Sequence, residues 1–464
     1  MLVAGALFVT LSAPVVIDGS PLADDYWICM RPVQDGAFWP YVGGMWEDGG
    51  VVRPARYLEY ALISTCRLLP FSLLILVPLA LKLLVAALLY ALLRDLHVRQ
   101  PWPAIGAAVW MLEPLGTEAA LWPAALHVHL ALALVLGALL LHRHGRLRWG
   151  TSAAIAACLA LEQAIFVLPL AVWASGRIET RRRATTATLA GCALVLAAYA
   201  TWPGRNPKNV MTLGDRLHGV FEDPSWYVQF PAAGLGFHSG PLGFLWAFPL
   251  SLAVVAITAT LGALIVPRLL GDGTRAFPDR LRVSKGLAMT AALVVLTNIP
   301  LIVTQPVGLS ARTFTPTWLV LCGVGALVGA RVRWRNLRVV GVVAGTFVAY
   351  AVLSLALSTS VRVRTAAFDR EAAQWLAART DDGDVVAVCE VPRVVVDPAP
   401  VGSFHLHALH FEDGSWIQYH SGRVVEVRRG GEVYWGARCP NLEDADLVIS
   451  FSQLLRNADA DDRS

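Results

Sequence analysis

Apolar stretches follow one another along the first three-quarters of the chain, and they constrain its fold more than any other feature. About eleven can be distinguished, and two of them are too short to cross a bilayer alone. They are Leu2–Ile17, Phe71–Leu93, Pro103–Leu112 with its continuation, Leu126–Leu141, Ser152–Leu161, Ala164–Trp173, Ala184–Thr201, Phe244–Val266, Leu287–Val303, Thr315–Gly329 and Val339–Leu357. Hydrophobic residues make up 56% of the chain and charged residues only 16%, unlike a soluble domain. We therefore predict an all-α polytopic membrane bundle of about 11 membrane segments.

Basic residues cluster in the linkers between these stretches. The basic linkers are Arg94/Arg99, Arg143/Arg146/Arg148, Arg177/Arg181/Arg182/Arg183, Arg268 to Lys285, and Arg331/Arg333/Arg335/Arg338. Basic loops stay on the cytoplasmic side of a membrane. All the basic linkers fit that side at once only if Ser152–Trp173 enters and leaves on the same side. We therefore predict a hairpin of two half-length helices there, with Glu162 near its turn at the outer end.

This orientation divides the chain into two domains. Residues 1–358 form the membrane domain, with 18–69 as its first outer loop, and residues 359–464 form a small extracytoplasmic α+β domain with a disordered end. We interpret Leu2–Ile17 as a retained first span rather than a signal peptide, because no basic residue precedes it and no clear cleavage site follows. The prediction is a multi-pass plasma-membrane protein with a cytoplasmic N-terminus.

The tail carries the mixed pattern of a small α+β domain. An amphipathic helix is expected over Phe368–Arg379, and strands over Val385–Val388, Trp416–Tyr419, Val424–Val427 and Leu447–Phe451. Its histidines, His405, His407, His410 and His420, lack the spacing of a four-ligand site, so we interpret them as solvated surface and predict no metal centre.

The cysteines suggest two disulfides on the outer side. Cys389 and Cys439 both lie in the tail, and Cys29 and Cys66 form a second, weaker pair in the first loop. Spacing alone does not fix either bond. Cys158, Cys192 and Cys322 lie inside apolar stretches and fit plain core positions.

Adjacent carboxylates open the first outer loop. Asp24 and Asp25 follow the first span closely, where each disfavours ionisation of the other. They fit a general base, or a divalent-cation site, directed at a substrate in the membrane interface. Taken alone, they fit a simple turn better, with Tyr26 and Trp27 as interfacial anchors.

Four further outer features follow in order along the chain. They are Gly49-Gly50-Val51-Val52-Arg53-Pro54 before an amphipathic stretch, Glu113-Pro114-Leu115-Gly116-Thr117-Glu118 with Trp122 and His127, Glu162 in the half-helix hairpin, and Arg312 at the mouth of a late span. This ordered set resembles the GT-C superfamily of polyprenyl-phosphate-dependent glycosyltransferases. The resemblance covers about residues 1–358 and rests on the order and sidedness of short motifs.

The resemblance implies an inverting enzyme of the cell envelope. Asp24 or Asp25 would be the catalytic base that takes the proton of an acceptor hydroxyl. Arg312 would hold the leaving lipid phosphate bidentately. Arg53, Glu118, His127 and Glu162 would line the substrate cavity. The implied partners are a polyprenyl-phosphate-linked sugar, a glycan, lipid or protein acceptor, and membrane lipids. No cofactor is identified, although a divalent cation fits the chemistry.

Alternative interpretations stay open at several positions. Glu162 could simply cap the short hairpin, and the side chain of Arg312 could simply extend to the membrane interface. His127 could be an ordinary polar residue of the interface. Lys82 lies inside an apolar stretch and is expected to face the bundle or a polar cavity. A transporter or flippase, or a non-catalytic assembly subunit, would also fit the chain. No basic surface interleaved with aromatic residues is recognisable, which excludes nucleic acid as a partner.

Overall fold

A computed structural model describes residues 1–21, 25–26, 28–30, 54–112, 120–201, 249–270, 289, 292–293, 296, 315–330, 337–389, 395–396, 403–404, 415–429, 445–450 and 453. The helices are α1 (Leu2–Asp18), α4 (Pro54–Ile63), η1 (Ser64–Arg67), α5 (Phe71–Asp95), α6 (Trp102–Leu112), η2 (Pro123–Ala125), α8 (Leu126–Arg143), α9 (Leu147–Ala160), α10 (Gln163–Ser175), α11 (Ile178–Thr201), α15 (Pro249–Leu270), α17 (Thr315–Gly329), α18 (Leu337–Ala377) and α19 (Ser415–Ser421). The strands are β1 (Val385–Cys389), β2 (Val395–Val396), β3 (Ser403–Phe404), β4 (Glu426–Arg429) and β5 (Leu447–Ser450). The chain is therefore mostly helical with a small sheet.

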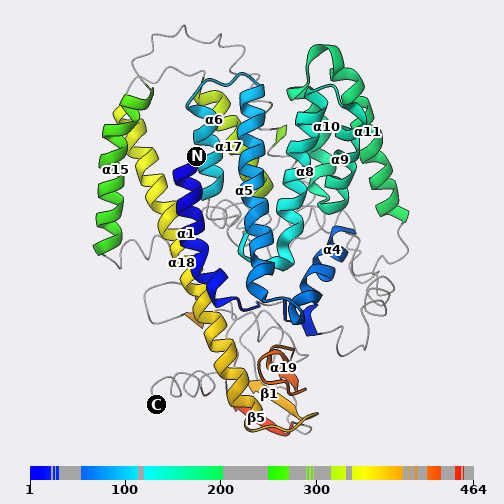
Figure 1. Ribbon diagram of the computed structural model, residues 1–464, viewed down its shortest axis with the longest axis vertical. Helices are drawn as coiled ribbons and strands as arrows, with labels where there is room; N and C mark the ends of the chain where they lie inside the picture. The colour runs from blue at the N-terminus through cyan, green and yellow to red at the C-terminus, as the bar shows by residue number, and fades with distance from the viewer. Residues whose placement is uncertain are drawn as a thin grey trace, which may run out of the picture.

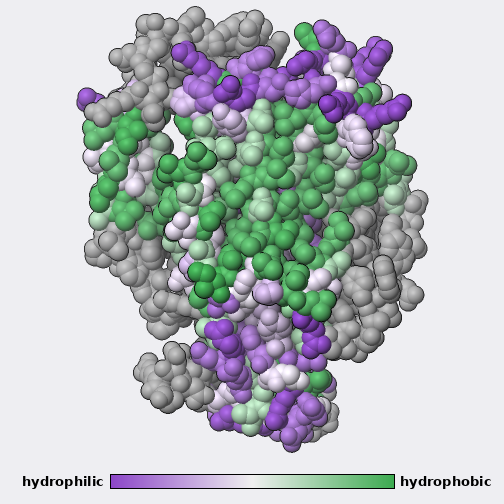
Figure 2. Space-filling model, viewed as in Figure 1, coloured by the Kyte–Doolittle hydropathy of each residue, from purple (hydrophilic) through white to green (hydrophobic). Residues whose placement is uncertain are grey.

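The helices form one body, and the tail forms a smaller unit at one end of it (Figure 1). Figure 2 shows an apolar belt around the visible face of the helical body, between a polar band at one end and the polar tail at the other. Among the described residues, two stretches have the length and hydropathy of a membrane-crossing helix, namely α5 and Pro123–Arg143. The other apolar stretches within the described helices, which include Ala253–Pro267 of α15 and Arg338–Leu353 of α18, are 10–17 residues long, so the expectation of about eleven membrane segments stays a prediction.

Arg143 joins three helix ends at the polar band. Its guanidinium forms an ion pair with Asp95 at the end of α5 and also donates to the Asp95 carbonyl oxygen at 2.7 Å. It donates as well to the carbonyl oxygen of Ser175, the last residue of α10. The C-terminal ends of helices carry partial negative charge and unpaired carbonyls, which a guanidinium satisfies. The C-terminal ends of α5, α8 and α10 therefore lie together.

The half-helix hairpin is confirmed. The helices α9 and α10 have 14 and 13 residues, and the chain reverses between them at Leu161 and Glu162. Both helices pack against α8, and α11 then packs along the pair. Because α10 returns to the end where α9 began, the basic linkers on either side of the hairpin share one end of the body (Figure 1).

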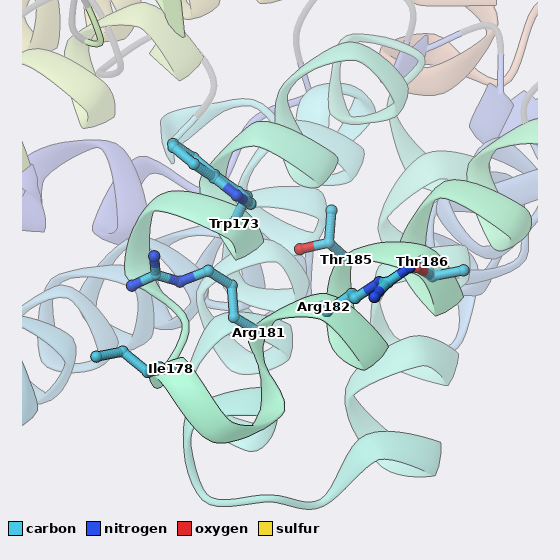
Figure 3. Close-up of a pocket in the computed structure, with 6 residues that line it drawn as sticks. All are labelled: Trp173, Ile178, Arg181, Arg182, Thr185 and Thr186. Atoms are coloured by element: carbon cyan, nitrogen blue, oxygen red, sulfur yellow. The ribbon is translucent and has the colours of Figure 1, made fainter.

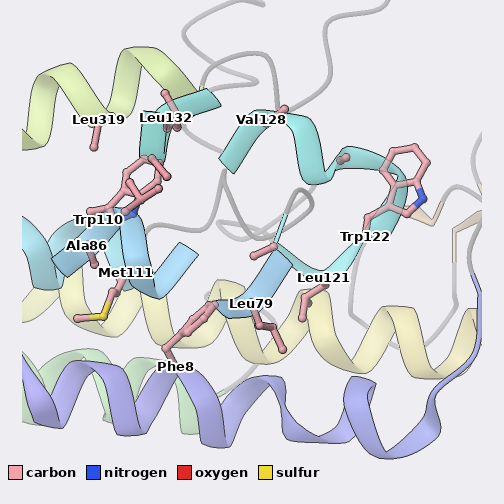
Figure 4. Packing of buried hydrophobic residues seen from close by; sticks show 14 of the residues in the cluster. Phe8, Leu79, Ala86, Trp110, Met111, Leu121, Trp122, Val128, Leu132 and Leu319 are labelled. Carbon is pink, nitrogen blue, oxygen red and sulfur yellow. The ribbon is translucent and has the colours of Figure 1, made fainter. Parts of the chain in front are cut away.

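One hydrophobic cluster runs through the centre of the helical body. Figure 4 shows Phe8 of α1, Trp110 of α6 and Leu132 of α8 among its members. Lys82 of α5 is fully buried in this region, with its ammonium 5.2 Å from the Phe8 ring centre and 5.8 Å from that of Trp110. It faces the interior of the bundle, as expected, and the two rings attract its charge.

The helices α15 and α18 pack closely because glycines line their contact. A Cβ atom placed on Gly345 would lie 2.0 Å from the carbonyl oxygen of Thr258, and one on Gly341 would lie 2.1 Å from that of Gly262. Small residues at such positions let two helix backbones approach each other.

The tail contains a three-stranded parallel sheet in the order β4-β1-β5, and β2 pairs antiparallel with β3. One expectation for the tail is wrong, and another is confirmed in a different setting. The expected strand Trp416–Tyr419 is helical, as part of α19. The helix expected over Phe368–Arg379 is confirmed as far as Ala377, although it is the end of α18, a helix of 41 residues that begins in the helical body. No glycine or proline interrupts the chain between Gly345 and Ala377, so nothing local ends that helix.

Candidate functional site

The first loop returns to the start of α8 and binds it through Asp25. This carboxylate is fully buried, and its Oδ1 accepts the backbone N–H of Ala124 in η2 at 3.1 Å. The first N–H groups of a helix have no partner within the helix, and a carboxylate there also meets the positive end of the helix dipole. Asp25 therefore stabilises the start of the η2–α8 segment.

Glu59 of α4 holds the same helix start. Its Oε1 accepts the backbone N–H of His127 at 2.5 Å and lies 2.6 Å from Nδ1 of the same residue. Both side chains are almost completely buried. A carboxylate can only accept, so the His127 ring carries its proton on Nδ1. Glu59 thereby fixes both the tautomer and the orientation of the His127 imidazole.

A disulfide fixes the loop that supplies these carboxylates. Cys29 is bonded to Cys66 in η1, with their Cα atoms 6.0 Å apart, so the weaker of the two expected pairs is confirmed. Cys389 is also disulfide-bonded, whereas its expected partner Cys439 lies outside the described residues. Cys158, Cys192 and Cys322 are buried and not disulfide-bonded, as expected, and the sulfur atoms of Cys158 and Cys192 lie 3.7 Å apart.

Glu162 lies at the turn of the hairpin, in the cap position of α10. Its side chain makes no capping hydrogen bond to that helix, so the interpretation of Glu162 as a simple cap loses its main support. The helix α4 packs against α9, η2 and the start of α8. Figure 1 shows α4 at the end of the body that faces the tail, next to the end of α9 from which the hairpin turns. Asp25, Glu59, His127 and Glu162 therefore belong to elements that meet at this end.

Tyr26, the neighbour of Asp25, enters the core of the tail. It is buried with Trp416, Val427 and other members of the tail's hydrophobic cluster. Its hydroxyl lies 3.1 Å from Nε2 of His420, so this histidine is partly buried and bonded rather than solvated as expected. Burial raises the pKa of Tyr26 well above its usual value, and the nearby carboxylate of Asp369 raises it further.

The end of α18 brings three charged residues to the same junction. Asp369 is fully buried, and burial raises its carboxyl pKa well above the usual range, opposed by the nearby Tyr26 hydroxyl. Neither carboxyl oxygen of Asp369 forms a hydrogen bond of ordinary geometry with a described residue. The Tyr26 hydroxyl nevertheless lies close enough to favour the ionised form of the Asp369 carboxyl. Burial lowers the pKa of Arg362 to about 10, while Asp25 and Tyr26 oppose that shift. Arg370 lies 3.8 Å from Asp18 at the end of α1.

The expected site residues have different outcomes. Asp25, His127 and Glu162 lie in elements that meet at one end of the helical body, whereas Asp24, Arg53, Glu118 and Arg312 lie outside the described residues. Sequence reasoning missed Glu59, which is 68 positions before its partner His127. An acidic residue on the apolar, amphipathic stretch after Pro54 was the available signal. Over the described ranges, no three His, Cys, Asp or Glu side chains gather as metal ligands.

A scan against protein-family models finds no matching family, and a search of curated proteins finds no significant match.

Proposed function

We propose that this chain is a multi-pass membrane glycosyltransferase of the GT-C type. It would transfer a sugar from a polyprenyl-phosphate donor to an acceptor on the side of the membrane where the tail lies. The observation that carries this proposal is the meeting of Asp25, Glu59 and His127 at the start of α8. Acidic and imidazole groups buried beside apolar helices at one end of a bundle mark a functional site more often than a structural one.

The charge distribution supports the proposed orientation. The described arginines of the basic linkers lie between α5 and α6, at the ends of α5, α8, α10 and α15, or at the starts of α9, α11 and α18, away from the tail. Positive residues favour the cytoplasmic side. The carboxylate end of the body and the tail would then lie together outside the cytoplasm, where lipid-linked sugars are used.

The proposed chemistry requires a base and a stabiliser for the leaving group. Asp24 or Asp25 would take the proton of the acceptor hydroxyl, and Arg312 would hold the departing lipid phosphate. The bond between the anomeric carbon and the phosphate oxygen breaks as the bond to the acceptor oxygen forms from the opposite face. The configuration at the anomeric carbon is therefore inverted. Because Asp25 is buried and already binds Ala124, we expect Asp24 to contribute more to turnover and Asp25 more to the shape of the site.

The test is turnover by the purified full chain. The protein is incubated with a panel of polyprenyl-phosphate sugars and varied acceptors, and release of the lipid phosphate is followed. We expect turnover by the native chain and a loss of at least about 100-fold in Asp24→Asn, the range typical of a missing general base. Asp446→Asn, a change in the exposed part of the tail, serves as the control.

Two outcomes would reject the proposal. Absence of turnover across the whole panel, with lipid binding retained, would indicate an assembly subunit. Movement of an intact lipid-linked sugar across a vesicle membrane, with no bond broken, would indicate a transporter or flippase.

A further inference from the structure

A hollow of about 430 Å³ opens where α10 ends and α11 begins, at the opposite end of the body from Asp25 and Glu59. Figure 3 shows its lining, which consists of Trp173, Ile178, Arg181, Arg182, Thr185 and Thr186. The lining combines two guanidinium groups and two hydroxyls with an indole and an aliphatic side chain. We propose that this hollow binds the phosphate headgroup of an anionic phospholipid.

Arg181 is held in place for such a contact. Its Nε and Nη2 donate to the carbonyl oxygen of Gly176 at 3.2 and 3.1 Å, and its guanidinium carbon lies 5.7 Å from the centre of the Trp173 ring. These contacts leave the Nη1 group available. A guanidinium positioned in advance loses little conformational freedom when it binds a phosphate.

Unsatisfied polar groups around the hollow favour an anion. The Thr185 hydroxyl is buried without a hydrogen-bond partner in the described chain, and Figure 3 shows it pointing towards the space between Trp173 and Arg181. The exposed Arg182, beside Thr186, has no carboxylate within ion-pair distance among the described residues. A buried hydroxyl without a partner is costly, and a phosphate oxygen would satisfy it.

The apolar surroundings favour a lipid over a free phosphate. The side chains of Trp173 and Ile178 are 46% and 87% exposed at the rim of the hollow. Leu189 and Leu196 follow Thr185 at spacings of four and eleven residues, which places them on the same face of α11, and they are 52% and 49% exposed. A headgroup in the hollow would therefore leave its acyl chains against an exposed apolar face.

The test measures lipid retention by the purified full chain. Native mass spectrometry records phosphatidylglycerol and phosphatidylcholine retained from mixed micelles. We expect retention of phosphatidylglycerol alone, and a loss of roughly tenfold in Arg181→Gln/Arg182→Gln. The matched control is Arg146→Gln/Arg148→Gln, which removes the same charge from exposed positions at the same end without touching the hollow. Thr185→Val should weaken retention several-fold, because it removes only the hydroxyl.

Further arms identify the source of the phosphate and guard against misfolding. Because Arg181 also binds Gly176, the single variant Arg182→Gln and a thermal unfolding curve accompany the double variant. Displacement of the lipid by millimolar inorganic phosphate would overturn the lipid assignment in favour of a free anion. Equal losses in the Arg181/Arg182 and Arg146/Arg148 variants would overturn the site altogether. Sugar transfer plays no part in this assay, so its result is independent of the proposed function.

Discussion

Acidification should loosen the junction between the tail and the first loop, because His420 is held neutral there. Burial, with a smaller contribution from Arg370, lowers the pKa of His420 to about 4, while Asp18 opposes the shift. Nε2 of the ring lies 3.1 Å from the Tyr26 hydroxyl. Protonation of His420 therefore charges a partly buried group beside the neutral tyrosine and the cationic Arg370.

The sign and size of the effect follow from the two pKa values. The unfolded histidine has a pKa of 6.5, so between pH 6.5 and about 4 the opened state binds more protons than the closed one. Stability contributed by neutral His420 is thus complete above pH 6.5 and lost as the pH falls towards 4. The gap corresponds to at most roughly 3 kcal/mol, and partial exposure of the ring reduces this to about 2 kcal/mol, or about 30-fold in the opening equilibrium.

Hydrogen exchange of the tail measures this opening. Exchange of α19 and β4 peptides is followed at pH 7.5, 6.0 and 5.0, with correction for the intrinsic rate. The native chain should lose protection on acidification, whereas His420→Gln should show a flatter dependence on pH. The exposed His144, at the other end of the body, provides the control variant His144→Gln. If His420→Gln and the native chain lost protection in parallel, or if acid increased protection, the assignment of the proton to His420 would be wrong.

Three further changes test a buried carboxylate at the start of α8, the contact between α15 and α18, and the buried carboxyl of Asp369. Glu59→Ala should destabilise the chain by about 1–3 kcal/mol because it leaves N–H groups of α8 unpaired, whereas Glu59→Gln keeps an acceptor and should cost less, as read from thermal unfolding. Gly345→Leu should separate α15 from α18 and lower the melting temperature, while Gly325→Leu, which meets open space, should not. Asp369→Asn should raise the melting temperature, and more at pH 8 than at pH 5. The pKa of this carboxyl is raised by folding, so its ionisation destabilises the folded chain increasingly as the pH rises above 3.8, the pKa of the unfolded state. Unchanged melting of Asp369→Asn at both pH values would contradict its burial as a source of instability.

The helices of the body could be predicted because their signal is local. A run of apolar residues ending in arginine defines a helix without knowledge of its neighbours, and the expected Thr315–Gly329 agrees with α17 at both ends. The half-length hairpin was predicted by a less local argument. Only a reversal around Glu162 brings the basic linkers to one side, and the two short helices follow from that constraint.

The contacts of the candidate site could not be predicted in the same way. Asp25 binds a backbone group 99 positions later, and no spacing rule connects the two. The segment Trp416–Tyr419 is too short for periodicity to separate strand from helix, and packing in the tail core decides it. The continuity of α18 beyond residue 358 was overlooked because the charge content changes there, although no residue that ends helices is present.

Adjacent residues of the first loop connect the two parts of the molecule. Asp25 is bonded to the start of α8 in the helical body, and Tyr26 is packed in the core of the tail with its hydroxyl on His420. Only one peptide unit joins Asp25 to Tyr26, and the backbone has only two soft dihedrals per residue. The tail and the loop therefore cannot move independently at this point. Loss of the His420 contact on acidification should therefore also weaken the hold of Asp25 on Ala124. Hydrogen exchange at η2 should follow that of α19 with the same dependence on pH, and independent behaviour of the two segments would show that Tyr26 does not couple them.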